Sequence, residues 1–262
     1  RSCYVTGVQT CALPIWTDFK SVAVISIAAA VHVGILVLEK DLGAALIYFV
    51  TYLMMLYVAT MKLRYLAAGA FAGTAASVVA YQLFAHVRVR VAAWQDPWSN
   101  MNQGGYQICQ SLFAIGTGGL FGMGLGQGMP KSVPVVESDF IFSAIAEEMG
   151  VIFCIFLILI YISSFIMFVN IALKMKKNFY KLCAFGLSVV LVFQVFLSIG
   201  GVTKFIPSTG VTLPLISYGG SSIITTIVIF SIIQGMYVRN RREEVTTNEE
   251  QAAINRKSGK RQ

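Results

Sequence analysis

Charged residues are scarce in this chain. Asp, Glu, Lys and Arg make up only 12% of its 262 residues, whereas 56% are hydrophobic. The mean hydropathy is +0.72. A soluble core could not absorb this much apolar sequence, so the composition excludes a soluble globular protein.

Other absences narrow the choice further. No Gly-Lys-Ser/Thr follows the glycine-rich stretch Gly104–Gly126, which excludes a P-loop nucleotide site. Only one of the five cysteines, Cys109, falls in the long connection between hydrophobic runs, so no disulfide framework is predicted. The net charge of +8 collects at the ends of those runs and in the C-terminal tail, and nothing indicates a nucleic-acid surface.

Six long apolar runs are present instead. A transmembrane helix needs about 20 apolar residues. The runs are Ser21–Leu38, Leu42–Thr60, Leu66–Ala85, Phe140–Leu173, Leu182–Val202 and Ile216–Val238. They predict an all-α polytopic membrane protein with six transmembrane helices and a large loop, His86–Ser138, between the third and the fourth.

The distribution of Lys and Arg predicts the orientation. One set of connections carries ten of them, at positions 20, 62, 64, 174, 176, 177, 181, 239, 241 and 242. The alternate set carries five: Lys40, Arg88, Arg90, Lys131 and Lys204. Cytoplasmic loops are enriched in these residues. The large loop is therefore predicted to face outward, and the C-terminus to be cytoplasmic.

The two ends of the chain differ from its middle. The stretch Val5–Ile15 resembles a translated sequencing-library adapter, so residues 1–15 are interpreted as an artefact. Residues 16–238 form the membrane domain. Residues 239–262 are polar and charged without apolar periodicity, which predicts a disordered cytoplasmic tail.

Irregular segments gather on the predicted outer side. They are the turn Leu38–Ala44, the glycine-rich stretch and the proline- and glycine-rich segment Pro207–Ser222. Irregular backbone at membrane depth is tolerated only where protein covers it or where it lines a wet cavity. Asp139 stands on the same side, at the mouth of the fourth run. These features predict an outward-facing polar site enclosed by hydrophobic helices.

Five motifs in this order resemble a known family. They are Glu39–Ala44, Gly105–Ser111, Ile115–Gly119, Asp139–Gly150 and Leu213–Ser222. Together they are similar to the SEDS proteins, the FtsW/RodA/SpoVE peptidoglycan glycosyltransferases, from Trp16 to about Val238. That family has ten membrane helices, so the resemblance implies a C-terminal fragment with the last six. Two positions depart from the family pattern: Lys40 and Ala44 stand where proline and threonine are usual.

The resemblance implies a function and its partners. It implies polymerisation of lipid II, the undecaprenyl-diphosphate-linked disaccharide pentapeptide, into glycan strands at the outer face of the bacterial cytoplasmic membrane. It also implies a class B penicillin-binding protein as transpeptidase partner and a divalent cation, Mg²⁺ or Mn²⁺. Asp139 matches the family's proposed catalytic aspartate, and Asp41 matches an aspartate that supports the cavity or a metal. The residues by themselves predict no metal-ligand cluster.

The chemistry of the residues agrees with that implication. A carboxylate such as Asp139 can deprotonate an acceptor hydroxyl. Cations must stabilise the departing diphosphate, and Arg88, Arg90 and Lys131 lie on the same predicted side. These residues are therefore the candidate substrate-binding groups, together with Asp41.

Plainer readings remain open for each of these residues. Asp139 or Ser138 could cap a helix, and Asp41 could be a turn residue. Arg88 and Arg90 could be anchors for lipid headgroups. Glu147 lies about 80° around a helix from Asp139 and could serve either function or helix packing. A precursor flippase and a non-catalytic membrane scaffold are the rival functions.

Overall fold

The computed structural model describes residues 19–259, and these form helices without any β-strand. The longer helices are α2 (Phe19–Leu38), α3 (Leu42–Thr60), α4 (Leu63–Leu83), α7 (Ile141–Lys174), α8 (Asn178–Val202) and α9 (Gly220–Gly259). The shorter elements between α4 and α7 are α5 (Ala85–Gln95), η1 (Met101–Gln103), α6 (Gly105–Gly118) and η2 (Pro130–Ser132). The segment 1–15, interpreted above as an artefact, lies outside the described residues.

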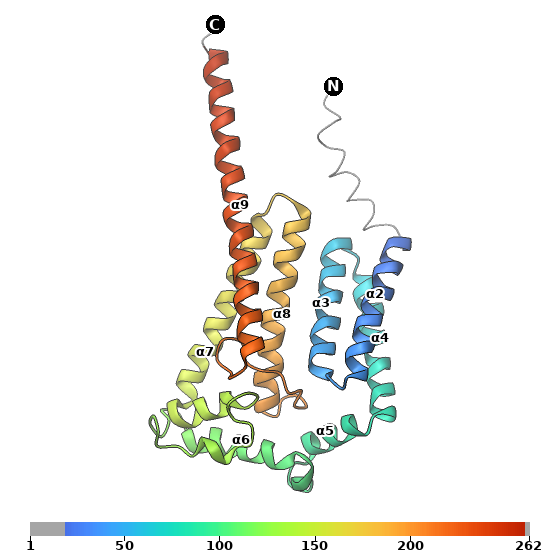
Figure 1. The fold of residues 1–262 in the computed structure, drawn as a ribbon, viewed down its shortest axis with the longest axis vertical. Helices are drawn as coiled ribbons and strands as arrows, with labels where there is room; N and C mark the ends of the chain where they lie inside the picture. Colours follow the sequence, from blue (N-terminus) through green and yellow to red (C-terminus); the bar gives the residue numbers. More distant parts are fainter. Residues whose placement is uncertain (1–18, 260–262) are drawn as a thin grey trace.

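The predicted polytopic helical fold is confirmed. Within residues 19–259, the five helices α3, α4, α7, α8 and α9 are long and apolar enough to cross a membrane, while α2 has a shorter apolar stretch, Val22–Leu38. The chain runs up and down through these six helices (Figure 1). Helices bond their backbone groups internally, which a bilayer demands.

The connections divide between the two ends of this bundle. The α2–α3 turn, α5, α6 and the loop between α8 and α9 lie at one end, the lower end in Figure 1. We call this the loop end. The α3–α4 and α7–α8 connections lie at the opposite end, from which α9 projects. The irregular segments predicted for one side of the membrane therefore share one end of the molecule.

Glycines set the close approach of neighbouring helices. A Cβ on Gly69 or Gly73 of α4 would overlap the side chains of Leu53 or Phe49 of α3. A Cβ on Gly186 of α8 would lie 2.7 Å from Met55 Sδ, again on α3. Small residues allow helices in membranes to pack closely where no hydrophobic drive brings them together. Helix α3 thereby joins α2 and α4 to α8.

Helix α7 is broken at Gly150, which has a φ of 82° and a ψ of 170°. The glycine-rich loop after α6 fits into this break. Val151 N donates to Gly119 O at 3.0 Å, and Met123 N donates to Glu147 O at 2.9 Å. A Cβ on Gly150 would overlap the backbone of Gly122, and a Cβ on Gly122 would overlap the backbone of Glu148. Neither position therefore tolerates a side chain. The backbone groups freed by the break are thus bonded to the loop.

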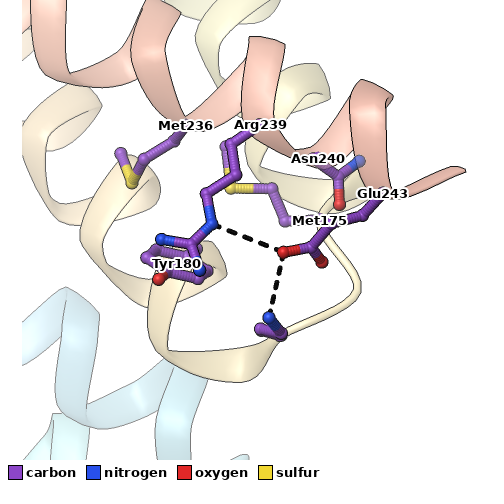
Figure 2. A pocket seen from close by; sticks show the side chains of 7 residues that line it. Met175, Tyr180, Met236, Arg239, Asn240 and Glu243 are labelled. Atoms are coloured by element: carbon purple, nitrogen blue, oxygen red, sulfur yellow. Dashed lines mark hydrogen bonds and ion pairs between the residues drawn. The ribbon is translucent and has the colours of Figure 1, made fainter. Parts of the chain in front are cut away.

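Helix α9 extends into the polar C-terminal residues, for which the sequence predicts a disordered cytoplasmic tail. The helix continues through residue 259 instead of ending near residue 238. Arg239 lies 5.1 Å from the centroid of the Tyr180 ring, and Glu243 accepts from Lys177 Nζ at 3.0 Å (Figure 2). Asn240 accepts from Lys176 N at 3.2 Å. Arg, Glu and Gln are good helix formers, and these contacts fasten the helix to the α7–α8 connection.

Candidate active site

The loop 203–219, between α8 and α9, is the element on which the candidate site is built. Helix α5 holds its start, because Trp94 Nε1 donates to Lys204 O at 3.0 Å. Gln194 of α8 holds its middle, donating from Nε2 to Thr212 O at 3.1 Å. Helix α6 supports the preceding turn through Ser111 Oγ, which donates to Val202 O at 3.0 Å. Side chains from α5 and α8 therefore bond to this loop, and a side chain of α6 bonds to the last residue of α8 just before it.

The segment before α7 is bonded to the same loop. Tyr218 N donates to Glu137 O at 2.8 Å, and the Ser217 hydroxyl donates to Ser138 O. Ser217 Oγ in turn accepts from Leu213 N at 2.7 Å. This pairing positions Asp139, which is half-buried at the start of α7.

Asp139 does not cap α7. The N-cap residue of the helix is Phe140, and no side chain accepts a hydrogen bond from its first turn. The Ser138 hydroxyl donates to Val135 O at 3.5 Å instead. The Asp139 carboxylate accepts no hydrogen bond from any described residue, so the capping alternative for Ser138 and Asp139 is wrong.

A small pocket between α8 and the loop contains this carboxylate. Ser198 and Gly201 of α8 line it, together with Ser208, Thr209 and Gly210 of the loop. Gly210 has a φ of 73°, and a Cβ on it would lie 3.6 Å from Asp139 Oδ2 and 4.0 Å from Arg90 Nη2. Glycine adopts this conformation without strain. Asp139 Oδ2 and Arg90 Nη2 therefore both lie within 4.0 Å of the point where a side chain on Gly210 would begin.

Arg90 belongs to this arrangement, whereas Arg88 stands apart. Arg90 Nη1 donates to Ser208 O at 3.5 Å. Two residues correspond to about 200° around a helix, so Arg88 is on another face of α5. Its side chain is exposed and bonds to no described residue. Lys131 of η2 is also exposed, and it does not line the pocket.

Asp41 caps α3, with its Oδ1 accepting from Ala44 N at 2.9 Å. Lys40, at the position where the family usually has proline, has a φ of 66°. The turn abuts the site loop, since a Cβ on Gly43 would lie 3.1 Å from Thr209 O. Asp41 therefore caps the helix that follows the turn abutting the loop, and it does not line the pocket.

The structure adds polar groups that sequence reasoning did not single out or left open. Ser198 Oγ and Thr209 Oγ1 are buried and have no hydrogen-bond partner among the described residues. Glu147 is only 6% exposed. Its Oε1 accepts from Met129 N at 3.1 Å, while its Oε2 has no partner there. A hydroxyl within an apolar run was the one available signal for Ser198.

Two groups near the site have shifted pKa values. The Ser99 hydroxyl, at 2.6 Å from Asp96 Oδ2, lowers the pKa of that carboxyl. Burial raises the pKa of the Cys109 thiol in α6. Neither group lines the pocket, so neither pKa shift bears on the chemistry of the candidate site.

The donor set limits what metal the site could hold. Within the part of the chain that the structure describes, no three His, Cys, Asp or Glu side chains come together. Asp139 is the one carboxylate on the pocket, beside the hydroxyls of Ser198 and Thr209. Mg²⁺ commonly binds through one or two carboxylates plus substrate phosphates. The residues fit an ion shared with a phosphorylated substrate, and they do not form a cage of their own.

The fold and the site together define a multi-pass helical membrane protein with a carboxylate and an arginine close to the same glycine, Gly210, at one end of the bundle. The chain belongs to the FtsW/RodA/SpoVE family, described as cell cycle proteins, whose sequence pattern matches residues 12–242.

Relatives with established names are similar to the chain. It is 41% identical over 214 residues to a peptidoglycan glycosyltransferase RodA of Mycobacterium bovis, covering 82% of this chain and 46% of RodA. It is 34% identical to a probable peptidoglycan glycosyltransferase FtsW of a Geobacter species, covering 80% of this chain and 58% of that protein. The chain thus spans about half the length of the curated relatives it matches.

A solved structure shares the fold. It is described as "Structural coordination of polymerization and crosslinking by a peptidoglycan synthase complex". The superposition has a TM-score of 0.70 at 27% sequence identity, and covers 86% of this chain and 63% of the other.

Proposed function

We propose that this chain carries the glycosyltransferase site of a peptidoglycan synthase, which polymerises lipid II into glycan strands. The observation that carries the proposal is that the Asp139 carboxylate, which accepts no hydrogen bond from a described residue, lies close to Gly210 together with the Arg90 guanidinium. A carboxylate free of hydrogen bonds can accept a proton, and an arginine beside it can bind phosphate. The names of the relatives support the same activity.

Asp139 is the general base in this proposal. It takes the proton of the acceptor sugar's hydroxyl while that oxygen forms a bond to the anomeric carbon of the donor. The bond from that carbon to the diphosphate breaks, and its electron pair leaves with the diphosphate. Arg90 neutralises the charge that develops there, because a guanidinium offers phosphate two parallel hydrogen bonds.

A divalent cation would add to this neutralisation. Mg²⁺ or Mn²⁺ would be held by Asp139 together with the substrate diphosphate, and would supply Lewis-acid stabilisation of the leaving group. The protein groups retain their roles in proton transfer and in orienting the sugar.

The proposed location is the outer leaflet of the bacterial cytoplasmic membrane. The distribution of Lys and Arg supports this location, because the end of the bundle from which α9 projects carries more of them than the loop end and cytoplasmic loops are enriched in these residues. Lipid II presents its sugars beside the membrane surface, where the pocket lies at the ends of α7 and α8. A class B penicillin-binding protein is the proposed transpeptidase partner, which the synthase complex of similar fold supports.

The test is a reconstitution of the full-length protein with its transpeptidase partner in vesicles that contain lipid II. Formation of glycan polymer on gels supports the proposal. Movement of lipid II between leaflets without any polymer would replace it with the flippase. If lipid II is neither polymerised nor moved between the leaflets, the non-catalytic scaffold is the remaining function.

A further inference from the structure

Ser198 is unusual among the helix hydroxyls of this protein. Such a hydroxyl commonly bonds back to a carbonyl one turn earlier. Ser188, on the same helix, does so by donating to Ala184 O at 2.6 Å. Ser198 is 4% exposed, yet its Oγ has no partner among the described residues. A buried polar group without a partner calls for an explanation.

Thr209 presents a second such group on the opposite wall. Its Oγ1 is also buried and unpartnered, and it lines the same pocket as Ser198 and Asp139. Helix α8 and the loop approach closely here, since a Cβ on Gly201 would lie 3.3 Å from Ser208 Cα. The space between them therefore admits a small group and not a whole sugar ring.

We propose that Ser198 and Thr209 bind a hydroxyl of the acceptor sugar and hold it against Asp139. This assignment rests on the glycosyltransferase function proposed above. A sugar hydroxyl both donates and accepts hydrogen bonds, as the hydroxyls of Ser and Thr do. A diphosphate would instead require cations, and no Lys or Arg of the described residues lines this pocket. The two hydroxyls are positioning residues, and the proton is taken by Asp139.

The assignment separates activity from stability. Ser198→Ala removes a hydroxyl that has no partner in the free protein, so the unfolding temperature should stay the same or rise. A lost hydrogen bond to bound sugar lowers kcat/KM by about three- to tenfold. Thr209→Val should act in the same way. Thr209→Ser keeps the hydroxyl and should restore most of the loss.

Matched controls exist on both walls. Ser188→Ala removes a bonded hydroxyl of α8 away from the pocket, so it should lower the unfolding temperature and leave kcat/KM unchanged. Thr203→Val removes a hydroxyl of the same connection that already donates to Ile199 O at 2.9 Å. It should likewise spare kcat/KM.

The experiment uses full-length protein in nanodiscs and measures two quantities for each variant. One is the rise in unfolding temperature caused by lipid II, and the other is the rate of polymer formation. Weaker lipid II binding and slower polymerisation by Ser198→Ala and Thr209→Val, but not by the controls, support the assignment. If the two variants bind lipid II more weakly but the wild type makes no polymer, the sugar-binding assignment stands and the proposed glycosyltransferase function is wrong. Variants that bind and polymerise like wild type overturn the assignment alone, and a wild type that neither binds nor polymerises lipid II overturns both.

Discussion

Replacing Asp139 by asparagine separates its chemical role from any structural one. The change keeps the size and shape of the side chain and removes its basicity. The carboxylate neither caps α7 nor accepts a hydrogen bond from a described residue. No native contact is therefore lost, and the free energy of unfolding should change by less than about 0.5 kcal/mol.

Activity should respond on a different scale. A positioned general base contributes roughly 10²- to 10⁴-fold to a rate, which corresponds to about 3–5 kcal/mol of transition-state stabilisation. Polymerisation by Asp139→Asn should fall by this factor. Binding of lipid II should persist, because Arg90 and the two pocket hydroxyls remain in place.

The assay is the initial rate of glycan formation from lipid II, with folded protein quantified for each variant. Glu137→Gln is the matched control, since Glu137 is an exposed carboxylate of the same segment and only its backbone oxygen takes part in the loop pairing. The control should retain wild-type rates. A rate for Asp139→Asn within about threefold of wild type, far short of the loss expected for a general base, would refute the assignment of Asp139.

Three further predictions concern topology, the arginines and Glu147. In protoplasts, a cysteine replacing the exposed Ser132 should react with an impermeant maleimide and one replacing Asn178 should not. Native Cys109 should stay unlabelled, because it is 1% exposed and burial raises the pKa of its thiol. Labelling at position 178 and not at position 132 would invert the topology. Arg90→Lys should slow polymerisation by about tenfold through loss of the bidentate contact, whereas Arg88→Lys should leave the rate unchanged; equal effects on both would favour the headgroup-anchor interpretation. Glu147→Ala should destabilise the fold by about 1–3 kcal/mol, because it leaves Met129 N–H without its acceptor, while Glu148→Gln should be neutral in thermal unfolding; an unchanged melting temperature for Glu147→Ala would show that the contact contributes nothing.

Much of the fold follows from hydrophobicity alone. Helices α2, α3, α4, α7 and α8 match their apolar runs to within four residues at each end, whereas α9 continues past its run to residue 259. In lipid only a helix bonds every backbone group within one segment. The break at Gly150 was not predicted, although one feature pointed to it. Helix α7 has 34 residues, and a straight helix of that length spans about 51 Å, well beyond a hydrocarbon core of about 30 Å.

The site was less predictable than the fold, because the order of residues does not determine which neighbouring element a side chain contacts. Asp139 could be singled out by its place at the start of an apolar run. Arg88 and Arg90 are equivalent as sequence, and only the packing of α5 against the 203–219 loop separates them. Ser198 reads as one small polar residue in a membrane helix, which is common, and its missing backbone bond is visible only in three dimensions.

The distribution of irregular backbone also bears on the rival functions. A transporter exposes its site to both sides in turn, and its broken helices lie near the middle of the membrane. Here the pocket, the break in α7 and the loop that fills it all lie towards the loop end. At the opposite end, α9 is fastened to the α7–α8 connection by Glu243 and Asn240. A site whose loop is hydrogen-bonded to α5 and α8 at one end of the bundle suits chemistry on a substrate presented from that side. A general base works well only when its distance to the acceptor hydroxyl is fixed.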